Sequence, residues 1–244
     1  MRFVSYKHKG SHHAGAVVEG RVVPLDGVRE LGARTPSAAL RDPVLRHQDS
    51  VALDEVRLRP VIPNPGKIVC VGLNYSSHVG ETGRDVPEYP VLFTKFADSL
   101  CAAGDAIVCP PESKQIDYEA ELAVVIGVTA RRVPRERALG AATPLGPELV
   151  TPDEAGDVSD LGIRLVLTGE TLQSSRTSRL MFDIPTLISS VSEFTTLRPG
   201  DVLLTGTPGG VGFRRDPQIF LSPGDHVRVE IDGIGRLDNS LRAE

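Results

Sequence analysis

Three acidic residues alternate with other residues near the middle of the chain. The stretch QIDYEAELAVVIG places Asp117, Glu119 and Glu121 at every second position and then continues as an apolar run. Such a run predicts a buried β-strand, in which alternate side chains point the same way and lie about 6 to 7 Å apart. At an effective dielectric constant near 20, each neighbouring pair of ionised carboxylates repels by about 2 to 3 kcal/mol. Raised pKa values, a basic side chain or a cation must offset this repulsion.

A histidine and a glutamate three residues apart form a second candidate group. His78 and Glu81 lie in GLNYSSHVGE, directly after the buried-strand pattern KIVCVG. On one helical turn, the carboxylate can accept a hydrogen bond from one imidazole nitrogen and leave the other nitrogen free as a base. This arrangement can activate water, although an isolated pair of this kind on a surface turn is more often structural.

The glycine-rich stretch LLTGTPGGVG is the third candidate. It lacks the Lys-Ser or Lys-Thr pair of a phosphate-binding loop, and no helix pattern follows it. The hydroxyls of Thr205 and Thr207, together with backbone N–H groups, can still face a carboxylate or an oxyanion. A tight turn that requires a positive φ at Gly209 or Gly210 explains the glycines equally well.

Composition excludes several classes of protein. The chain has 244 residues, a net charge of -5 and a pI near 5.7, and its longest basic run is Arg131-Arg132, which argues against nucleic acid as a partner. Apolar runs stay short of the roughly 18 residues of a membrane span, and the start MRFVSYKHKG is not apolar enough for a signal peptide. We therefore predict a cytoplasmic protein without a membrane partner. Three cysteines without C-x-x-C spacing indicate reduced thiols.

Nineteen prolines and twenty-four glycines divide the sequence into short segments, many of them rich in Val, Ile, Leu and Thr. This pattern predicts a mainly β, α+β fold. Helices are expected over residues 133–139 and 184–192, the second with Asp183 as N-cap and Pro185 in its first turn. The proline-rich joint IPNPGK favours a boundary near residue 60, between a small N-terminal β-rich cap domain (1–60) and a catalytic domain (61–244). His8, His12 and His13 of the first domain are expected to be solvated.

Six motifs occur in an order that resembles the fumarylacetoacetate hydrolase family. They are KIVCVGLNYSSHVGE, PVLFTK, DYEAELAVVIG, PLGPELVTPDE, TLQSSRTSRLMF and LRPGDVLLTGTPGGVG. The resemblance implies a mixed, rolled β-sheet catalytic domain that is usually found as a homodimer. It also implies a small-molecule 2-oxo acid or β-diketo acid as substrate.

The resemblance assigns roles to the candidate residues. Glu119 and Glu121 correspond to the family's metal-binding pair, which usually holds Mg²⁺ or Mn²⁺, and hard carboxylate oxygens also suit Ca²⁺. Asp117 falls at a position that supports the site. His78 and Glu81 correspond to the base dyad. Substrate contacts are implied for three residues: Tyr75, Lys95 and Thr207.

The implied reaction is hydrolysis of a C–C bond in an acylpyruvate or a fumarylpyruvate-like acid. The substrate chelates the cation, His78 deprotonates water, hydroxide attacks the distal carbonyl, and a metal-bound enolate leaves. An isomerase or tautomerase of the 2-hydroxyhepta-2,4-diene-1,7-dioate type, or a 2-oxo acid decarboxylase, could use the same site. A catalytically silent dimer that serves in binding or structure is the alternative from another class.

The chain departs from the family pattern between Leu139 and Gly140. Family members carry several tens of residues there, including the Asp that is the third metal ligand and a lysine. Either this chain lacks the segment, or a mobile segment of the protein is hidden at this point. Loss of a central strand would remove part of the core and of the site, and we therefore expect the hidden segment.

Overall fold

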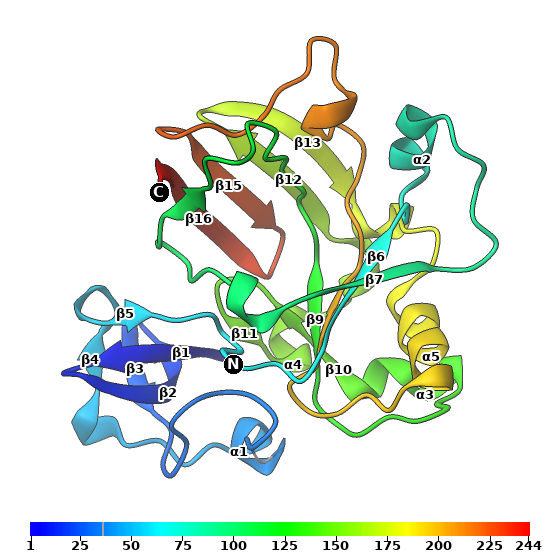
Figure 1. Ribbon diagram of the computed structural model, residues 1–244. Coiled ribbons are helices and arrows are strands. Elements are labelled where there is room, and N and C mark those ends of the chain that lie inside the picture. The colour runs from blue at the N-terminus through cyan, green and yellow to red at the C-terminus, as the bar shows by residue number, and fades with distance from the viewer. Residues whose placement is uncertain (36) are drawn as a thin grey trace.

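A computed structural model describes residues 1–35 and 37–244. Within these ranges the strands form two sheets, with short helices at their margins (Figure 1). The predicted mainly β, α+β fold is therefore confirmed. The α-helices are α1 (Ser37–Arg41), α2 (Ser76–Thr82), α3 (Arg135–Ala138), α4 (Pro152–Ala155) and α5 (Ile184–Phe194).

The larger sheet runs through both halves of the described chain in the order β4-β3-β2-β1-β11-β10-β9-β14-β6-β7, with β5 beside β1. Its N-terminal strands are β1 (Arg2–His8), β2 (Ser11–Val18), β3 (Arg21–Pro24), β4 (Val51–Ala52) and β5 (Arg57–Leu58). The others are β6 (Ile68–Gly72), β7 (Val91–Lys95), β9 (Ala123–Ile126), β10 (Ala142–Leu145), β11 (Leu149–Val150) and β14 (Val202–Leu204). Because β1 pairs with β11, the N-terminal region continues the sheet that also contains β9 and β14.

A second sheet has five strands in the order β13-β12-β15-β16-β8 (Figure 1). Its strands are β8 (Ile107–Cys109), β12 (Gly162–Leu167), β13 (Glu170–Arg176), β15 (His226–Ile231) and β16 (Gly235–Ala243). Pairing between β12 and β13 shifts at Leu165 and Val166. This bulge leaves both Leu172 and Gln173 buried, at 6% and 1% exposure, although successive strand residues normally face opposite sides.

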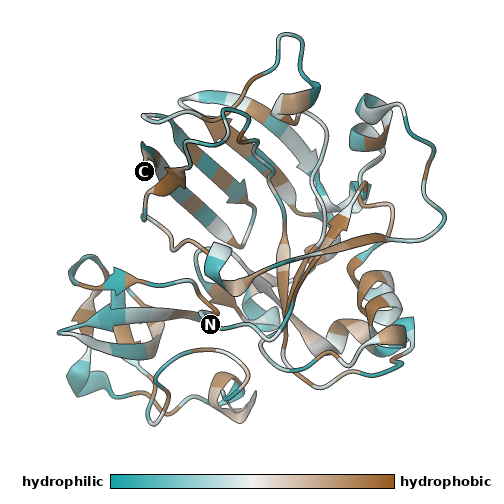
Figure 2. Ribbon diagram, viewed as in Figure 1, coloured by the Kyte–Doolittle hydropathy of each residue, from teal (hydrophilic) through white to brown (hydrophobic). Residues whose placement is uncertain are grey.

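Two large apolar cores hold the sheets together. One joins β9 and β14 to α5 and the five-stranded sheet, and the other joins β1, β2 and β6. The central strands β6 and β9 are among the most hydrophobic segments of the molecule (Figure 2). The predicted boundary near residue 60 falls in the connection between β5 and β6, and the division into two domains stays a prediction.

Helix α5 follows from its sequence signals. The side chain of Asp183 accepts a hydrogen bond from the backbone N–H of Thr186 at 2.9 Å, and Pro185 lies in the first turn. Ile184, Leu187 and Val191 then turn one apolar face to the core. The helix expected over 133–139 is shorter, because α3 covers only Arg135–Ala138 before a 3₁₀ turn.

The chain is continuous at the junction between Leu139 and Gly140. A 3₁₀ turn spans Leu139–Ala141, and the backbone N–H of Ala142 donates to the carbonyl of Leu139. Strand β10 begins at once and pairs with β9, Ala142 opposite Ile126. The turn shows how these residues connect at this point, and the expectation of a hidden segment stays a prediction.

Candidate active site

Helix α2 brings the predicted base pair to the end of β6. The helix follows Tyr75, whose backbone is extended, and stops at Gly83, whose φ of 65° only glycine adopts readily. Within this helix, Nδ1 of His78 lies 3.0 Å from Oε1 of Glu81. Because an ionised carboxylate can only accept, Glu81 fixes the proton on Nδ1 and leaves Nε2 as the basic nitrogen.

The glycine-rich loop after β14 fixes this helix in place. The N–H of Gly210 donates to Oε2 of Glu81 at 2.6 Å, and the N–H of Gly209 donates to Oγ of Ser77 at 3.1 Å. Both oxygens of Glu81 are therefore in use, and His78 is oriented by a carboxylate that is itself held. The predicted positive φ occurs at Gly210 (100°), whereas Gly209 does not have one and Gly206 does (100°).

The acids of the opening motif lie just ahead of a regular strand. Strand β9 begins only at Ala123, so the prediction that the acids lie within the strand is wrong in detail. The alternation nevertheless holds, because Tyr118, Ala120 and Leu122 are buried while the acids between them are not. The regular strand starts late because the N–H of Ala120 donates to a side chain, Gln173, rather than to a neighbouring strand.

Glu119 and Glu121 lie close enough to share a hydrogen bond. Burial and the charge of Glu119 raise the pKa of Glu121 to about 8, although the N–H of Gly206 donates to its Oε2 at 2.6 Å. Glu119 is exposed as a residue, but its carboxyl group lies among enough protein atoms that burial raises its pKa too. Without a cation, it is therefore unfavourable for both carboxyl groups to be ionised at once.

Asp117 has a different role from its neighbours. Its Oδ1 accepts from the N–H groups of Tyr118 (2.8 Å) and Gly212 (2.7 Å), and its Oδ2 accepts from the N–H of Phe213 (2.9 Å). These bonds tie the acid segment to the end of the glycine-rich loop. The geometry agrees with the predicted supporting position.

The two threonines of the loop differ in what they offer. Thr205 donates its hydroxyl proton to the carbonyl of Leu122 at 2.9 Å, so it is committed to the core and is not available to a ligand. The Oγ of Thr207 instead accepts from Nε2 of Gln173 at 2.9 Å. Of the two predicted hydroxyls, only that of Thr207 keeps its proton for another partner.

Gln173 is the site residue that the sequence did not reveal. Its carbonyl accepts from the N–H of Ala120 at 2.8 Å, and its amide donates to Thr207 and to the carbonyl of Pro208 at 2.8 Å. One buried side chain thus joins the acid segment to the glycine-rich loop. Its only sequence signal was its place in the TLQSSRTSRLMF motif, because a neutral amide carries no charge pattern.

Tyr75 and Lys95 face the acid pair from other elements. Tyr75 is fully buried, its hydroxyl has no hydrogen-bond partner among the described residues, and burial together with the charge of Glu121 raises its pKa. Lys95, at the end of β7, is exposed, and its positive charge partly opposes the rise that burial causes in the pKa of both glutamates. An orphaned hydroxyl and a cation beside two acids are groups that a polar ligand could engage.

The acid pair suits a hard divalent cation in charge and chemistry. Two carboxylates that repel each other gain from a shared cation, and an all-oxygen donor set without sulfur fits Mg²⁺ or Mn²⁺. No group of three His, Cys, Asp or Glu side chains that could hold a metal occurs in residues 1–35 and 37–244. A cation held by this pair would need further ligands from other groups.

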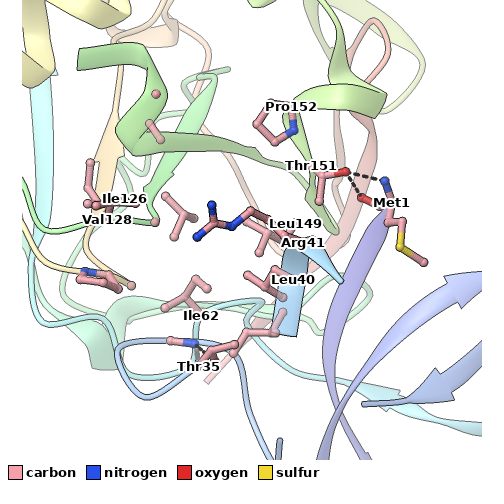
Figure 3. Close-up of a pocket in the computed structure, with 18 of the residues that line it drawn as sticks. Met1, Thr35, Leu40, Arg41, Ile62, Ile126, Val128, Leu149, Thr151 and Pro152 are labelled. Atoms are coloured by element: carbon pink, nitrogen blue, oxygen red, sulfur yellow. Dashed lines mark hydrogen bonds between the residues drawn. The ribbon is translucent and has the colours of Figure 1, made fainter. Parts of the chain in front are cut away.

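A cavity of about 370 Å³ lies away from these acids, between the N-terminal region and β9. Leu40, Ile62 and Leu149 line it, and the side chain of Arg41 extends into it (Figure 3). None of the residues of the acid pair, the histidine dyad or the glycine-rich loop lines this cavity. It is separate from the candidate site.

The fumarylacetoacetate hydrolase C-terminal family matches residues 67–141 and 139–242. The chain belongs to this family of enzymes. It is 38% identical to the mitochondrial oxaloacetate tautomerase fahd2 of Xenopus laevis, over an alignment that covers 80% of this chain and 71% of that protein.

Solved structures show the same fold. A 5-carboxymethyl-2-hydroxymuconate delta-isomerase from Mycobacterium smegmatis is 30% identical with a TM-score of 0.81, and the match covers 100% of both chains. Maleylpyruvate hydrolase from Sphingobium sp. SYK-6, solved with manganese(II) and pyruvate, has a TM-score of 0.77 at 24% identity, over 100% of this chain and 99% of that one. The fold thus occurs with isomerase and hydrolase activities.

The comparisons locate the absent segment independently. The family match is divided at residues 139–141. The alignment with the frog protein runs over 227 positions, whereas 80% of 244 residues is only about 195, so about thirty positions of that relative have no counterpart here. The division coincides with the 3₁₀ turn at Leu139–Ala141.

Proposed function

We propose that the protein catalyses the keto–enol tautomerisation of a 2-oxo acid of the oxaloacetate type, assisted by a divalent cation. The observation that carries this proposal is the 38% identity to an oxaloacetate tautomerase across most of the chain. Tautomerisation moves one proton and breaks no C–C bond. Among the activities considered it needs the fewest groups, and a site that lacks part of the family pattern can supply them.

His78 is the proton carrier in this proposal. Its Nε2 accepts a proton from the carbon beside the keto group and returns one to the keto oxygen, so that the bound substrate becomes its enol. Glu81 and Gly210 hold the imidazole in the necessary tautomer and orientation.

Glu119 and Glu121 hold the cation, Mg²⁺ or Mn²⁺, which polarises the keto group as a Lewis acid when bound. Tyr75, Lys95 and Thr207 surround the remaining polar atoms of the substrate. Lys95 offers a positive charge to a carboxylate, and Thr207 offers a hydroxyl. The raised pKa of Glu121 supports this assignment, because a bound cation would offset both the burial of the carboxylate and its repulsion from Glu119, which raise that pKa.

Hydrolysis of a C–C bond is the second candidate, and the His78–Glu81 pair favours it because a base held in this way can also deprotonate water. An assay with purified protein separates the two. We expect metal-dependent tautomerisation of oxaloacetate in the presence of Mg²⁺ or Mn²⁺, and slower or no cleavage of acylpyruvates and 2-hydroxymuconate-type diacids. Cleavage faster than tautomerisation would make hydrolysis the first candidate function. Absence of turnover with either metal would favour a catalytically silent dimer.

We also propose that the protein forms a homodimer. Strand β7 is the last strand of the larger sheet in the described chain, and Val91 and Phe93 on it are 43% and 46% exposed, followed by Phe96 at 76%. An apolar sheet edge of this kind is a typical surface for association. Light scattering after size-exclusion chromatography should give about twice 26.2 kDa, and a monomer mass would contradict the proposal.

The predicted cytoplasmic location stays a proposal. In the described part of the chain, no helix combines the length and apolar character needed to cross a membrane. The name of the frog relative places that protein in mitochondria. Fractionation of cells that express the protein at its native level would distinguish the two compartments.

A further inference from the structure

Gln173 determines which way the hydroxyl of Thr207 points. The carbonyl of Pro208 and the N–H of Ala120 fix the orientation of the amide, because a carbonyl can only accept and an N–H can only donate. The Nε2 group must therefore face Pro208 and Thr207. It follows that the Oγ of Thr207 is the acceptor in their 2.9 Å hydrogen bond.

The proton of the Thr207 hydroxyl is left for a ligand. Among the hydrogen bonds of the described residues, this hydroxyl accepts from Gln173 and donates to no protein group. Thr207 is 3% exposed, so bulk water does not provide a ready substitute. A buried donor without an acceptor carries a desolvation cost until a partner binds.

We propose that Gln173 is a positioning residue that holds the Thr207 hydroxyl as a donor toward an anionic oxygen of the substrate. This inference rests on the proposed function for the identity of that oxygen, which we assign to the carboxylate of a 2-oxo acid. Neither residue takes part in proton transfer. Their effect is on substrate binding and therefore on KM rather than kcat.

The sharpest variant is Q173E, which keeps the shape of the side chain and replaces the donor by an acceptor. The introduced carboxylate can still accept from the N–H of Ala120, but it also accepts a hydrogen bond from the Thr207 hydroxyl, which then no longer points its proton at the substrate. We expect KM for oxaloacetate to rise about ten-fold or more, the size of a lost hydrogen bond to a charged group, with kcat changed much less. T207V should raise KM similarly, and T207S should restore wild-type KM.

The double variant separates this role from a general effect of added charge. If Gln173 acts through the Thr207 hydroxyl, Q173E should raise KM little further in a T207V background. N239D is the matched control, because Asn239 is also a buried strand amide, whose Nδ2 donates to the carbonyls of Ala102 and Asp105 far from the acids. It should leave KM unchanged even where it lowers the unfolding midpoint. A full Q173E effect in the T207V background would overturn the proposal.

Binding of oxalate, measured by calorimetry with Mn²⁺ present, gives a readout that does not depend on turnover. Loss of oxalate affinity in Q173E and T207V, but not in T207S or N239D, supports the inference even where no 2-oxo acid is turned over, and in that case only the proposed function fails. Equal oxalate affinity in the wild type and Q173E overturns the inference while wild-type tautomerisation can still stand. Absence of oxalate binding to the wild type counts against both.

Discussion

The two sides of β9 differ in how completely their neighbouring segments are built. On the side of β14 and β13, the acid segment is tied to the glycine-rich loop by Asp117, Glu121 and Gln173, each of which accepts from or donates to backbone groups at 2.6 to 2.9 Å. On the side of β10, the chain passes through a 3₁₀ turn into a short strand, and about thirty residues of the relatives are absent. The bonded side contains the groups to which we assign proton transfer, and the other side lacks the segment to which the resemblance assigns a third ligand.

This difference affects the two parts of the proposed site unequally: the groups assigned to proton transfer, and the groups assigned to the cation. The histidine dyad and the glycine-rich loop are built from local helix and loop contacts that do not involve the junction. The proposed cation, in contrast, would rest on the acid pair, because no group of three His, Cys, Asp or Glu side chains that could hold a metal occurs among the described residues. We therefore expect the proton-transfer groups to be intact and the cation to be weakly held, which is a further reason to favour the least demanding reaction.

The largest effect should come from the acid pair. E121Q or E119Q should abolish metal-dependent turnover, because either change removes half of the protein ligands of the cation while the fold stays intact. Turnover measured against increasing Mn²⁺ checks this expectation. D117N is a useful comparison, since Asp117 contacts backbone N–H groups and should affect stability more than metal dependence. Full activity of E121Q at limiting Mn²⁺ would exclude the site.

The second-largest effect should come from the His78–Glu81 pair. H78A should lower hydrolytic kcat by about 10² or more, the usual size of a lost general base. Tautomerisation should slow by a similar factor, because His78 carries the proton in the proposed reaction. Rates measured for both reactions with H78A test this assignment, and unchanged tautomerisation would remove His78 from the mechanism.

The third effect tests the incomplete side. With two protein ligands, an octahedral cation must fill its shell with water, and we expect Mn²⁺ to bind with a Kd of about 10⁻⁴ M or weaker. Oxalate should tighten this binding by about ten-fold, because it replaces two waters. Calorimetry with and without oxalate measures both values. Micromolar affinity without oxalate would show that another group of the chain completes the site.

The sequence indicated the residues whose types and spacing suit acid–base or metal chemistry and missed the neutral amide of Gln173. His78, Glu81, Glu119 and Glu121 stood out because their types and spacings suit acid–base and metal chemistry. Gln173 could not be found in this way, because its burial depends on a bulge between two strands of the other sheet. The mainly β fold and helix α5 followed from local patterns and capping signals.

The start of the strand after the acid segment, and the structure at the junction between Leu139 and Gly140, depend on tertiary contacts that local sequence patterns do not reveal. Regular strand pairing starts only at Ala123, because the backbone ahead of it bonds to a side chain. Alternation alone cannot distinguish such an extended segment from a strand. At the junction the sequence pattern allowed either explanation, and the expectation of a hidden segment followed from the apparent cost of losing a central strand. β10 reduces that cost, because it takes a place beside β9.

The smallest effect is on the pH dependence of stability without metal. The pKa of Glu121 is about 8 in the folded chain, above the ordinary value of 4.5 that applies once the chain unfolds. Between these values the folded state holds a proton that the unfolded state has released. Stability that depends on this proton is fully present below about pH 4.5 and is lost as the pH rises through 8. The unfolding midpoint of the metal-free protein should therefore fall by several degrees between pH 5 and 8.5.

E121Q tests this cause directly, because a neutral amide does not titrate and cannot repel Glu119. Its midpoint should fall less than that of the wild type over the same pH range, and at pH 8 the variant should be the more stable of the two without metal. Saturating Mn²⁺ should reverse that order, since the cation stabilises only a folded state with both carboxylates. Thermal unfolding followed by circular dichroism, with EDTA or with excess Mn²⁺, measures both comparisons. Parallel pH profiles of E121Q and the wild type in EDTA would show that the acid pair does not cause the pH dependence.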